Sequence, residues 1–110
     1  MTTLQQTIEA AWDDRSLLEK AETKAAIREL IDLLDKGKLR VAEPTASGEW
    51  QVNQWVKKGV VLYFPIQQME TIEVGPFEFH DKIPLKKEYA ELGVRVVPHA
   101  IARHGAFLES

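Results

Sequence analysis

The sequence predicts a small α+β domain that is rich in helix and carries short β-hairpins. Two patterns point to this fold class: apolar residues recur at helical spacing over residues 4–12 and 26–34, and they alternate with polar residues over residues 39–52. The chain has 110 residues, of which 45% are hydrophobic. A chain of this size and composition can bury a core of its own, so we expect one folded domain.

Two amphipathic helices are expected in the first third of the chain. Thr3 can cap the first of them, because Gln6 lies three residues further on and the pair matches a capping box. The apolar stripe of this helix is formed by Leu4, Ile8, Ala11 and Trp12. A second helix is expected over residues 23–36, with Gly37 after its end. Its inward face comprises Ala26, Ile27, Leu30, Ile31 and Leu34.

A hairpin and a third helix are expected next. Residues 39–44 and 49–52 alternate like two short strands on either side of a turn. Asn53 can cap a helix that Pro65 would end, although the β-branched residues of this stretch leave a strand open. The apolar stripe of the helix comprises Trp55, Val56, Gly59, Val60 and Tyr63.

Two packing expectations attach to this region. We expect Trp50, Trp55 and Tyr63 to bury one another, since aromatic residues at this spacing are typical of a core. Gly59 lies within the apolar stripe although glycine lowers helix propensity by about 1 kcal/mol relative to alanine. A glycine in such a place indicates that another stretch of backbone approaches the helix closely.

Short elements are expected in the second half of the chain. Residues 69–74 and 77–83 flank Gly75-Pro76, a pair typical of turns, and are expected to form a second pair of extended segments. One or two helical turns should follow over residues 85–92. Gly93 is placed to end them.

The charge balance argues against a nucleic-acid partner. The chain has 14 lysine and arginine residues against 17 aspartate and glutamate residues, so no polyanion-binding face is indicated. It has no cysteine, and its beginning lacks the pattern of a signal peptide. The longest apolar block, residues 59–65, is too short to span a bilayer. We therefore expect a cytoplasmic protein without a membrane partner.

The residue types that carry most enzyme chemistry do not form a recognisable motif. The three histidines, His80, His99 and His104, lack the i, i+4 spacing of helical metal ligands. His80 and Asp81 could form an acid/base pair, but neighbours on a strand point to opposite faces. No glycine-rich phosphate loop or nucleophile elbow occurs. We expect no catalytic residue, no metal ligand and no cofactor-binding residue in this chain.

Arg95 is the most informative charged residue. It lies in the apolar run Val94–Val97, which resembles a strand and which Pro98 breaks. Strand alternation would place Arg95 and Val97 on one face. The arginine fork can hold a carboxylate through two hydrogen bonds. Two interpretations remain open, a surface arginine paired with a nearby acid and a contact to a ligand carboxylate.

A resemblance to a known family selects between these interpretations. Five segments occur in order, namely "LLDKGKLRVAEP", "GEWQVNQWVKKGVVLYF", "FHDKIPLK", "GVRVVP" and "ARHGAF". In this order and spacing the chain resembles the N-terminal domain of the tetrahydrodipicolinate N-succinyltransferases. The resemblance covers the whole chain. It implies a helix-rich domain that precedes a left-handed parallel β-helix of hexapeptide repeats, and this β-helix is missing here.

The resemblance also implies a division of the chain. Residues 1–98 would form the helix-rich domain, and residues 99–110 would begin the transition into the absent β-helix. Phe107 and Leu108 would then be the first residues to face its interior, without the coils that cover them. We accordingly expect a domain fragment whose tail beyond Pro98 is loose.

In the family, succinyl is transferred from succinyl-CoA to tetrahydrodipicolinate during lysine and diaminopimelate biosynthesis. The resemblance implies that the arginine of "RVVP", Arg95, binds a substrate carboxylate. It places the CoA groove and the acidic catalytic residues in the β-helix, between the subunits of a homotrimer, so the isolated chain should be inactive. Two alternatives stay open: a free-standing binding or regulatory module that docks onto the full enzyme, and a domain that only packs beside the β-helix.

Overall fold

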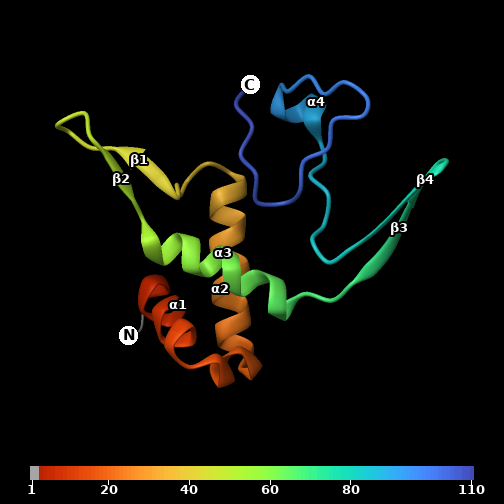
Figure 1. The fold of residues 1–110 in the computed structure, drawn as a ribbon. Helices are drawn as coiled ribbons and strands as arrows, with labels where there is room; N and C mark the ends of the chain where they lie inside the picture. Colours follow the sequence, from red (N-terminus) through yellow and green to blue (C-terminus); the bar gives the residue numbers. More distant parts are fainter. Residues whose placement is uncertain (1–2) are drawn as a thin grey trace.

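The computed structural model describes residues 3–110 (Figure 1). Its helices are α1 (Leu4–Asp13), the short 3-10 helix η1 (Arg15–Glu19), α2 (Ala21–Asp35), α3 (Gln54–Ile66) and α4 (Tyr89–Leu92). Its strands are β1 (Ala42–Pro44), β2 (Trp50–Val52), β3 (Glu70–Val74) and β4 (Phe77–Asp81). The predicted α+β class is confirmed, and residues 3–110 contain no β-helix.

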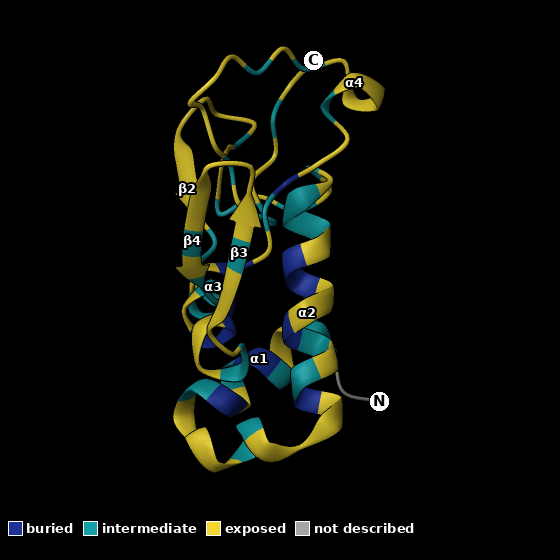
Figure 2. Cartoon of the chain, turned by 90° about the vertical axis from the view of Figure 1, so that its right-hand side faces the viewer, coloured by how far each residue is buried: buried dark blue, intermediate teal, exposed yellow. Residues whose placement is uncertain are grey.

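The core lies between α1, α2 and α3, each of which packs against the other two. Figure 2 shows the buried residues concentrated on these three helices, whereas the hairpins and α4 are mostly exposed. The buried apolar residues are Ile8, Ala11, Ile27, Leu30, Ile31, Val56, Leu62, Tyr63 and Ile83. The helical stripes predicted from the sequence therefore form the core. None of the helices within residues 3–110 combines the length and apolar character needed to cross a membrane.

The ends of the first two helices follow from local chemistry. Thr3 Oγ1 accepts a hydrogen bond from the Gln6 amide at 3.1 Å, and Gln6 Oε1 accepts one from the Thr3 amide at 2.9 Å. This is the predicted capping box. After the C-terminal end of α2, Gly37 has a φ of +73°, a conformation that glycine adopts without strain. The Lys38 amide then reaches back to the Leu33 carbonyl at 2.9 Å and satisfies it.

Residues 54–66 form a helix, so the alternative of a strand is wrong. Pro65 lies inside the last turn of α3 and does not end it before that point. Asn53 precedes the helix but makes no capping hydrogen bond with its side chain. Its Nδ2 donates instead to the Arg40 carbonyl at 2.8 Å and to Glu43 Oε1 at 3.2 Å. Asn53 therefore joins the first hairpin to α3.

Gly59 marks a close contact, as expected, but the neighbour is a side chain and not backbone. A Cβ atom at this position would lie 2.6 Å from Leu30 Cδ1, well inside contact distance. Leu30 is fully buried, so α2 inserts this side chain into the space that the missing side chain of Gly59 leaves on α3.

Two antiparallel hairpins extend from the helices on opposite sides (Figure 1). In the first, Pro44 pairs with Trp50, and Trp50 is 71% exposed. The prediction that Trp50 packs with Trp55 and Tyr63 is therefore wrong, because this two-stranded arm does not lie over the helices. In the second hairpin, Ile72 pairs with Phe79 around the predicted turn.

The chain between residues 82 and 101 departs most from expectation. α4 begins at Tyr89, and not near Leu85, because Leu85 is paired with Arg103. Gly93 ends α4 as predicted, with a φ of +70°. Residues 94–97 do not form a strand, so the predicted alternation around Arg95 does not apply. The Val94 amide bonds back to the Tyr89 carbonyl at 2.9 Å, and no strand within residues 3–110 pairs with this run.

Candidate functional site

Residues 87–101, which we name the Arg95 loop, leave the body of the domain and return to it. At the base of the loop, Leu85 bridges to Arg103. The Lys86 amide donates to the Ala102 carbonyl at 3.0 Å, and the His104 amide donates to the Pro84 carbonyl at 2.8 Å. Residues 84–86 and 102–105 therefore form a neck that holds the two ends together. A surface loop with closed ends of this kind is an Ω-loop.

The Arg95 loop, together with Ala102 and Leu108, lines an open hollow of about 270 Å³. Its lining residues are Tyr89, Val94, Arg95, Val96, Val97, Ala100, Ile101, Ala102 and Leu108. Arg95 is the one charged residue among them. The hollow therefore combines an apolar wall with a single guanidinium group, and this combination suits a small ligand that carries a carboxylate.

Arg95 is exposed and, among residues 3–110, makes no hydrogen bond or ion pair. Arg103 differs, because its Nε donates to Asp81 Oδ2 at 3.0 Å and its second guanidinium nitrogen donates to Asp81 Oδ1 at 3.1 Å. Within residues 3–110, Arg95 thus has no paired surface acid. Its planar fork can receive both oxygens of a ligand carboxylate without first breaking a bond within the described chain.

The three histidines lie apart, each with partners of its own. His80 Nδ1 lies 3.1 Å from Thr71 Oγ1 on the exposed hairpin, whereas Asp81 pairs with Arg103. His80 and Asp81 thus have different partners, as expected for strand neighbours. The ring of His99 meets Phe77 edge-on, with 5.8 Å between the centroids.

His104 belongs to an ionic cluster that sequence reasoning missed. Its Nε2 lies 2.7 Å from Asp32 Oδ1, and its Nδ1 lies 3.4 Å from Asp35 Oδ1. Lys86 Nζ lies 2.6 Å from the same Asp35 oxygen, which also accepts the Gly105 amide at 2.9 Å. We name Asp32, Asp35, Lys86 and His104 the neck cluster, because these residues fasten the neck to the end of α2. The tail beyond Pro98, expected to be loose, is thus held at residues 102–105, whereas the domain division at Pro98 stays a prediction.

The neck cluster is held together by ion pairs and hydrogen bonds. Across the described residues 3–110, no three His, Asp or Glu side chains are arranged to hold a metal ion. Burial raises the pKa of Asp35, but the hydrogen bonds from Lys86 and from the Gly105 amide, together with the charges of His104 and Lys86, outweigh it. The pKa of Asp35 therefore lies below its ordinary value.

This depressed pKa predicts a contribution to stability that acid removes. The folded state favours ionised Asp35, so the contribution is present above the ordinary pKa of about 3.8 and is lost as the pH falls through the lower folded value. At pH 7, Asp35→Asn should lower the free energy of unfolding by about 1.5 to 3 kcal/mol, the range for hydrogen bonds to charged groups.

Urea unfolding of both proteins between pH 7 and pH 2 measures this effect. The difference between wild type and Asp35→Asn should shrink below about pH 3.8. Asp14 and Asp81 also have lowered pKa values, but they titrate in both proteins and cancel in the comparison. A difference that stays constant down to pH 2 would contradict the assigned role of the Asp35 charge.

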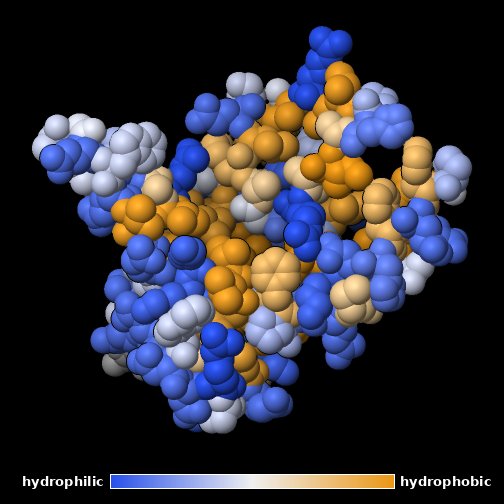
Figure 3. Space-filling model, in the orientation of Figure 1, coloured by the Kyte–Doolittle hydropathy of each residue, from blue (hydrophilic) through white to orange (hydrophobic). Residues whose placement is uncertain are grey.

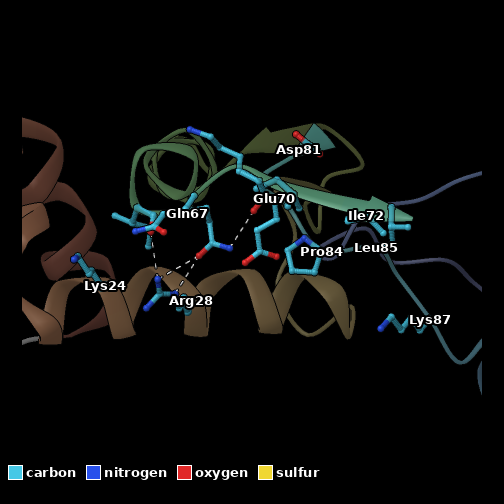
Figure 4. Close-up of a pocket in the computed structure, with 13 residues that line it drawn as sticks. Lys24, Arg28, Gln67, Glu70, Ile72, Asp81, Pro84, Leu85 and Lys87 are labelled. Carbon is cyan, nitrogen blue, oxygen red and sulfur yellow. Dashed lines mark hydrogen bonds between the residues drawn. The ribbon is translucent and has the colours of Figure 1, made fainter. Parts of the chain in front are cut away.

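A larger cleft of about 600 Å³ lies between α2, the end of α3 and the second hairpin (Figure 4). On one wall, Arg28 donates to Gln67 Oε1 and to the Ile66 carbonyl, each at 3.3 Å. Gln67 Nε2 in turn donates to the Lys82 carbonyl at 3.2 Å. Figure 4 shows Lys24 and Lys87 at opposite ends of the cleft. Arg28 is thus engaged with Gln67 and Ile66, and Lys24 and Lys87 lie far from each other.

Apolar surface gathers near the Arg95 loop. Figure 3 shows it over the part of the molecule that carries α4 and the chain end. Val97 and Ile101 are 54% and 57% exposed, respectively. Phe107 lies against Gly37, and the Arg40 guanidinium lies 4.7 Å from the centre of its ring. The loop thus presents an apolar surface around the Arg95 guanidinium, which has no partner within residues 3–110.

Comparisons with known proteins agree with the resemblance predicted from the sequence. Residues 3–66 match the family described as tetrahydrodipicolinate N-succinyltransferase N-terminal. Relatives named 2,3,4,5-tetrahydropyridine-2,6-dicarboxylate N-succinyltransferase include proteins of Aeromonas salmonicida, 49% identical over 98% of this chain, and of Leptothrix cholodnii, 49% identical over 96%. A third, from Pseudoalteromonas translucida, is 43% identical over 98%.

The chain spans 42% of the length of these relatives. The match to the family model covers residues 3–66, which include the three core helices. The wider matches to whole relatives also take in the Arg95 loop, because they cover nearly the entire chain. The chain therefore belongs to the family of tetrahydrodipicolinate N-succinyltransferase N-terminal domains.

Proposed function

We propose that this chain acts as the N-terminal domain of a tetrahydrodipicolinate N-succinyltransferase. The observation that carries the proposal is the 49% identity, over 98% of the chain, with an Aeromonas salmonicida protein of that name. Such an enzyme moves succinyl from succinyl-CoA to the nitrogen of tetrahydrodipicolinate, in the cytoplasmic synthesis of lysine and diaminopimelate. Water adds to the C=N bond of the substrate, and the resulting amine nitrogen attacks the thioester carbonyl. The thioester C–S bond breaks as the amide C–N bond forms, the ring opens at its hydrated carbon to give a ketone, and CoA leaves as the free thiol with the proton from the nitrogen.

Within this reaction, Arg95 binds one carboxylate of the dicarboxylate substrate. Its exposure, its lack of a partner within residues 3–110 and the apolar wall of the hollow support this role. A hydrogen bond to a charged group contributes about 1.5 to 3 kcal/mol, which is too little to hold a small dianion on its own. Arg95 is therefore one part of a site that other protein groups must complete.

The remaining parts of the site lie outside this chain in our proposal. Among the residues that line the hollow, none is a carboxylate, a histidine or a serine that could activate the substrate nitrogen. We therefore assign the succinyl-CoA groove, the acid/base groups and the homotrimer contacts to the part of the relatives that this chain does not match. This chain holds no cofactor in the proposal, and it supplies substrate binding and not the chemical step.

A chimeric enzyme tests the proposal. This chain replaces the matching segment of the Aeromonas salmonicida relative, and release of CoA from succinyl-CoA is measured with tetrahydrodipicolinate present. The chimera should turn over at a typical enzyme rate, about 1 to 1000 per second. The isolated 110-residue chain should release no CoA above background.

The parent relative and its truncated form without this segment are the controls. The proposal fails if the chimera folds and assembles like the parent yet stays inactive. Turnover by the isolated chain would contradict the division of roles, because the chemical step would then lie within these residues.

A further inference from the structure

We propose that Asp35 is a positioning residue for Arg95: its carboxylate closes the neck of the Arg95 loop and so fixes where the guanidinium lies. This inference rests on the proposed function only in its final step, the effect on substrate use. Asp35 touches neither Arg95 nor the hollow, so it acts through the neck.

One oxygen of Asp35 joins the two sides of the neck. From residues 84–86, the segment that leads into the loop, Lys86 Nζ donates to Asp35 Oδ1 at 2.6 Å. The same nitrogen lies 3.3 Å from the Asp35 carbonyl oxygen. From residues 102–105, the returning segment that leads out of the loop, the Gly105 amide donates to the same Oδ1 at 2.9 Å. Figure 1 shows this returning segment passing the end of α2. Asp35 thus fastens both sides of the neck to a helix of the core.

The bond between Asp35 and Lys86 is the most buried ion pair of the described residues. The side chains of Lys86 and Asp35 are 4% and 18% exposed, whereas those of Arg103 and Asp81 are 47% and 36% exposed. Exposed ion pairs contribute little to structure, but a buried cation that loses its partner is strongly unfavourable. The Lys86 ammonium therefore makes the neck depend on Asp35.

The Arg95 loop has few other attachments. Within residues 87–101, the backbone hydrogen bonds of the structure run between loop residues, as from the Ala100 amide to the Val97 carbonyl. The loop's described contacts beyond the neck are the edge-on meeting of His99 with Phe77, which lies on an exposed hairpin, and the approach of the chain end, where Ser110 lies beside Gly93 and Leu108 lines the hollow. Because the loop is joined to the core through its neck, a change in the neck changes the position of the whole loop.

The shape of the loop rests on turns and hydrogen bonds within it, so we expect the loop to move as a unit. Glu88 and Gly93 flank α4 with φ angles of +66° and +70°, which turn the chain into and out of this short helix. Weakening the neck should therefore displace Arg95 without unfolding the hollow. A displacement of about 1 Å in a binding contact can lower the rate by about 100-fold.

The test compares Asp35→Asn with Asp32→Asn. Both residues lie on α2, and both contact the returning segment, but Asp32 is 56% exposed and contacts only His104. In the 110-residue chain, amide exchange of Lys86, His104 and Gly105 should become at least about tenfold faster in Asp35→Asn, equivalent to about 1.4 kcal/mol. Exchange of core amides such as that of Leu62 should change much less. Asp32→Asn, which removes one exposed contact and leaves the Lys86 and Gly105 contacts in place, should speed exchange of the neck amides less than Asp35→Asn does.

In the chimera, Asp35→Asn should lower kcat/KM for tetrahydrodipicolinate by about 10- to 100-fold. The KM for succinyl-CoA should not change, and Asp35→Glu should restore part of the loss because it returns the charge. If Asp35→Asn fails to fold, Lys86→Met removes the same ion pair from the other side and serves in its place.

The outcomes separate this inference from the proposed function. Unchanged exchange of the neck amides overturns the inference, and so does faster exchange with unchanged kinetics for the dicarboxylate. An equal fall in kcat/KM for both substrates also overturns it, since that pattern indicates a general loss of folded enzyme. The proposed function fails by different results: an assembled but inactive chimera contradicts the assignment of the domain, and normal kinetics in Arg95→Ala contradict the role of Arg95.

Discussion

Replacing Arg95 by alanine in the chimera should lower kcat/KM for tetrahydrodipicolinate by about 30- to 1000-fold, equivalent to about 2 to 4 kcal/mol. The reason is that Arg95 is the charged residue of the hollow, and its removal leaves a substrate carboxylate against an apolar wall. Arg95→Lys should fall between wild type and alanine, because an ammonium keeps the charge but loses the two-pronged geometry.

Steady-state kinetics with each substrate varied in turn measures this effect. The KM for succinyl-CoA should stay within about twofold of wild type, because Arg95 is proposed to contact only the dicarboxylate. Arg15→Ala is the matched control. Arg15 is also an exposed arginine, but it lies in η1, outside the Arg95 loop and its neck. Its guanidinium lies 4.9 Å from the centre of the Trp12 ring. Arg15→Ala should leave kcat/KM for tetrahydrodipicolinate and the KM for succinyl-CoA unchanged.

Leu30→Ala should destabilise the domain by about 2 to 5 kcal/mol, the usual range for truncating a fully buried leucine. Leu30 fills the space beside Gly59, so its loss leaves a cavity between α2 and α3. Gly59→Ala alone combines two opposing effects. The new methyl group would collide with Leu30 at a cost of about 1 to 3 kcal/mol, while alanine favours helix over glycine by about 1 kcal/mol.

The double variant Leu30→Ala/Gly59→Ala should be more stable than the sum of the single changes predicts, because the new methyl group then occupies part of the cavity. Urea unfolding of the four proteins measures this coupling. Val61→Ala, on the exposed side of α3, should change the free energy of unfolding by less than about 0.5 kcal/mol. Strict additivity of Leu30→Ala and Gly59→Ala would contradict the contact between α2 and α3.

Local signals predicted most of the helical core. The capping box at Thr3 and Gln6 needs only neighbours in sequence, and the structure contains both of its hydrogen bonds. The stripe of α2 was predicted for the same reason, since helical periodicity shows which face is buried. Trp50 shows the limit of this reasoning. The spacing of the aromatic residues favoured burial of Trp50, but whether a two-stranded arm lies over the helices depends on the tertiary arrangement.

The region around Arg95 was predicted less well. Residues 94–97 look like a strand, but a strand needs a partner, and none of the strands within residues 3–110 lies beside them. The neck cluster joins Asp35 to Lys86 and to Gly105, which are 51 and 70 positions away in the chain. No local pattern predicts such pairs. The importance of Arg95 came from the resemblance, because residue chemistry alone left two interpretations open.

The central claim is that this chain contributes Arg95 to the substrate site, where its guanidinium binds a carboxylate of the substrate. Equilibrium titration of the chimera with tetrahydrodipicolinate, without succinyl-CoA so that no turnover occurs, tests it most directly. We predict that wild type binds the dicarboxylate about 30- to 1000-fold more tightly than Arg95→Ala, while both bind succinyl-CoA equally. Equal affinity of the two proteins for the dicarboxylate would contradict the claim and leave Arg95 as an exposed arginine of a surface loop.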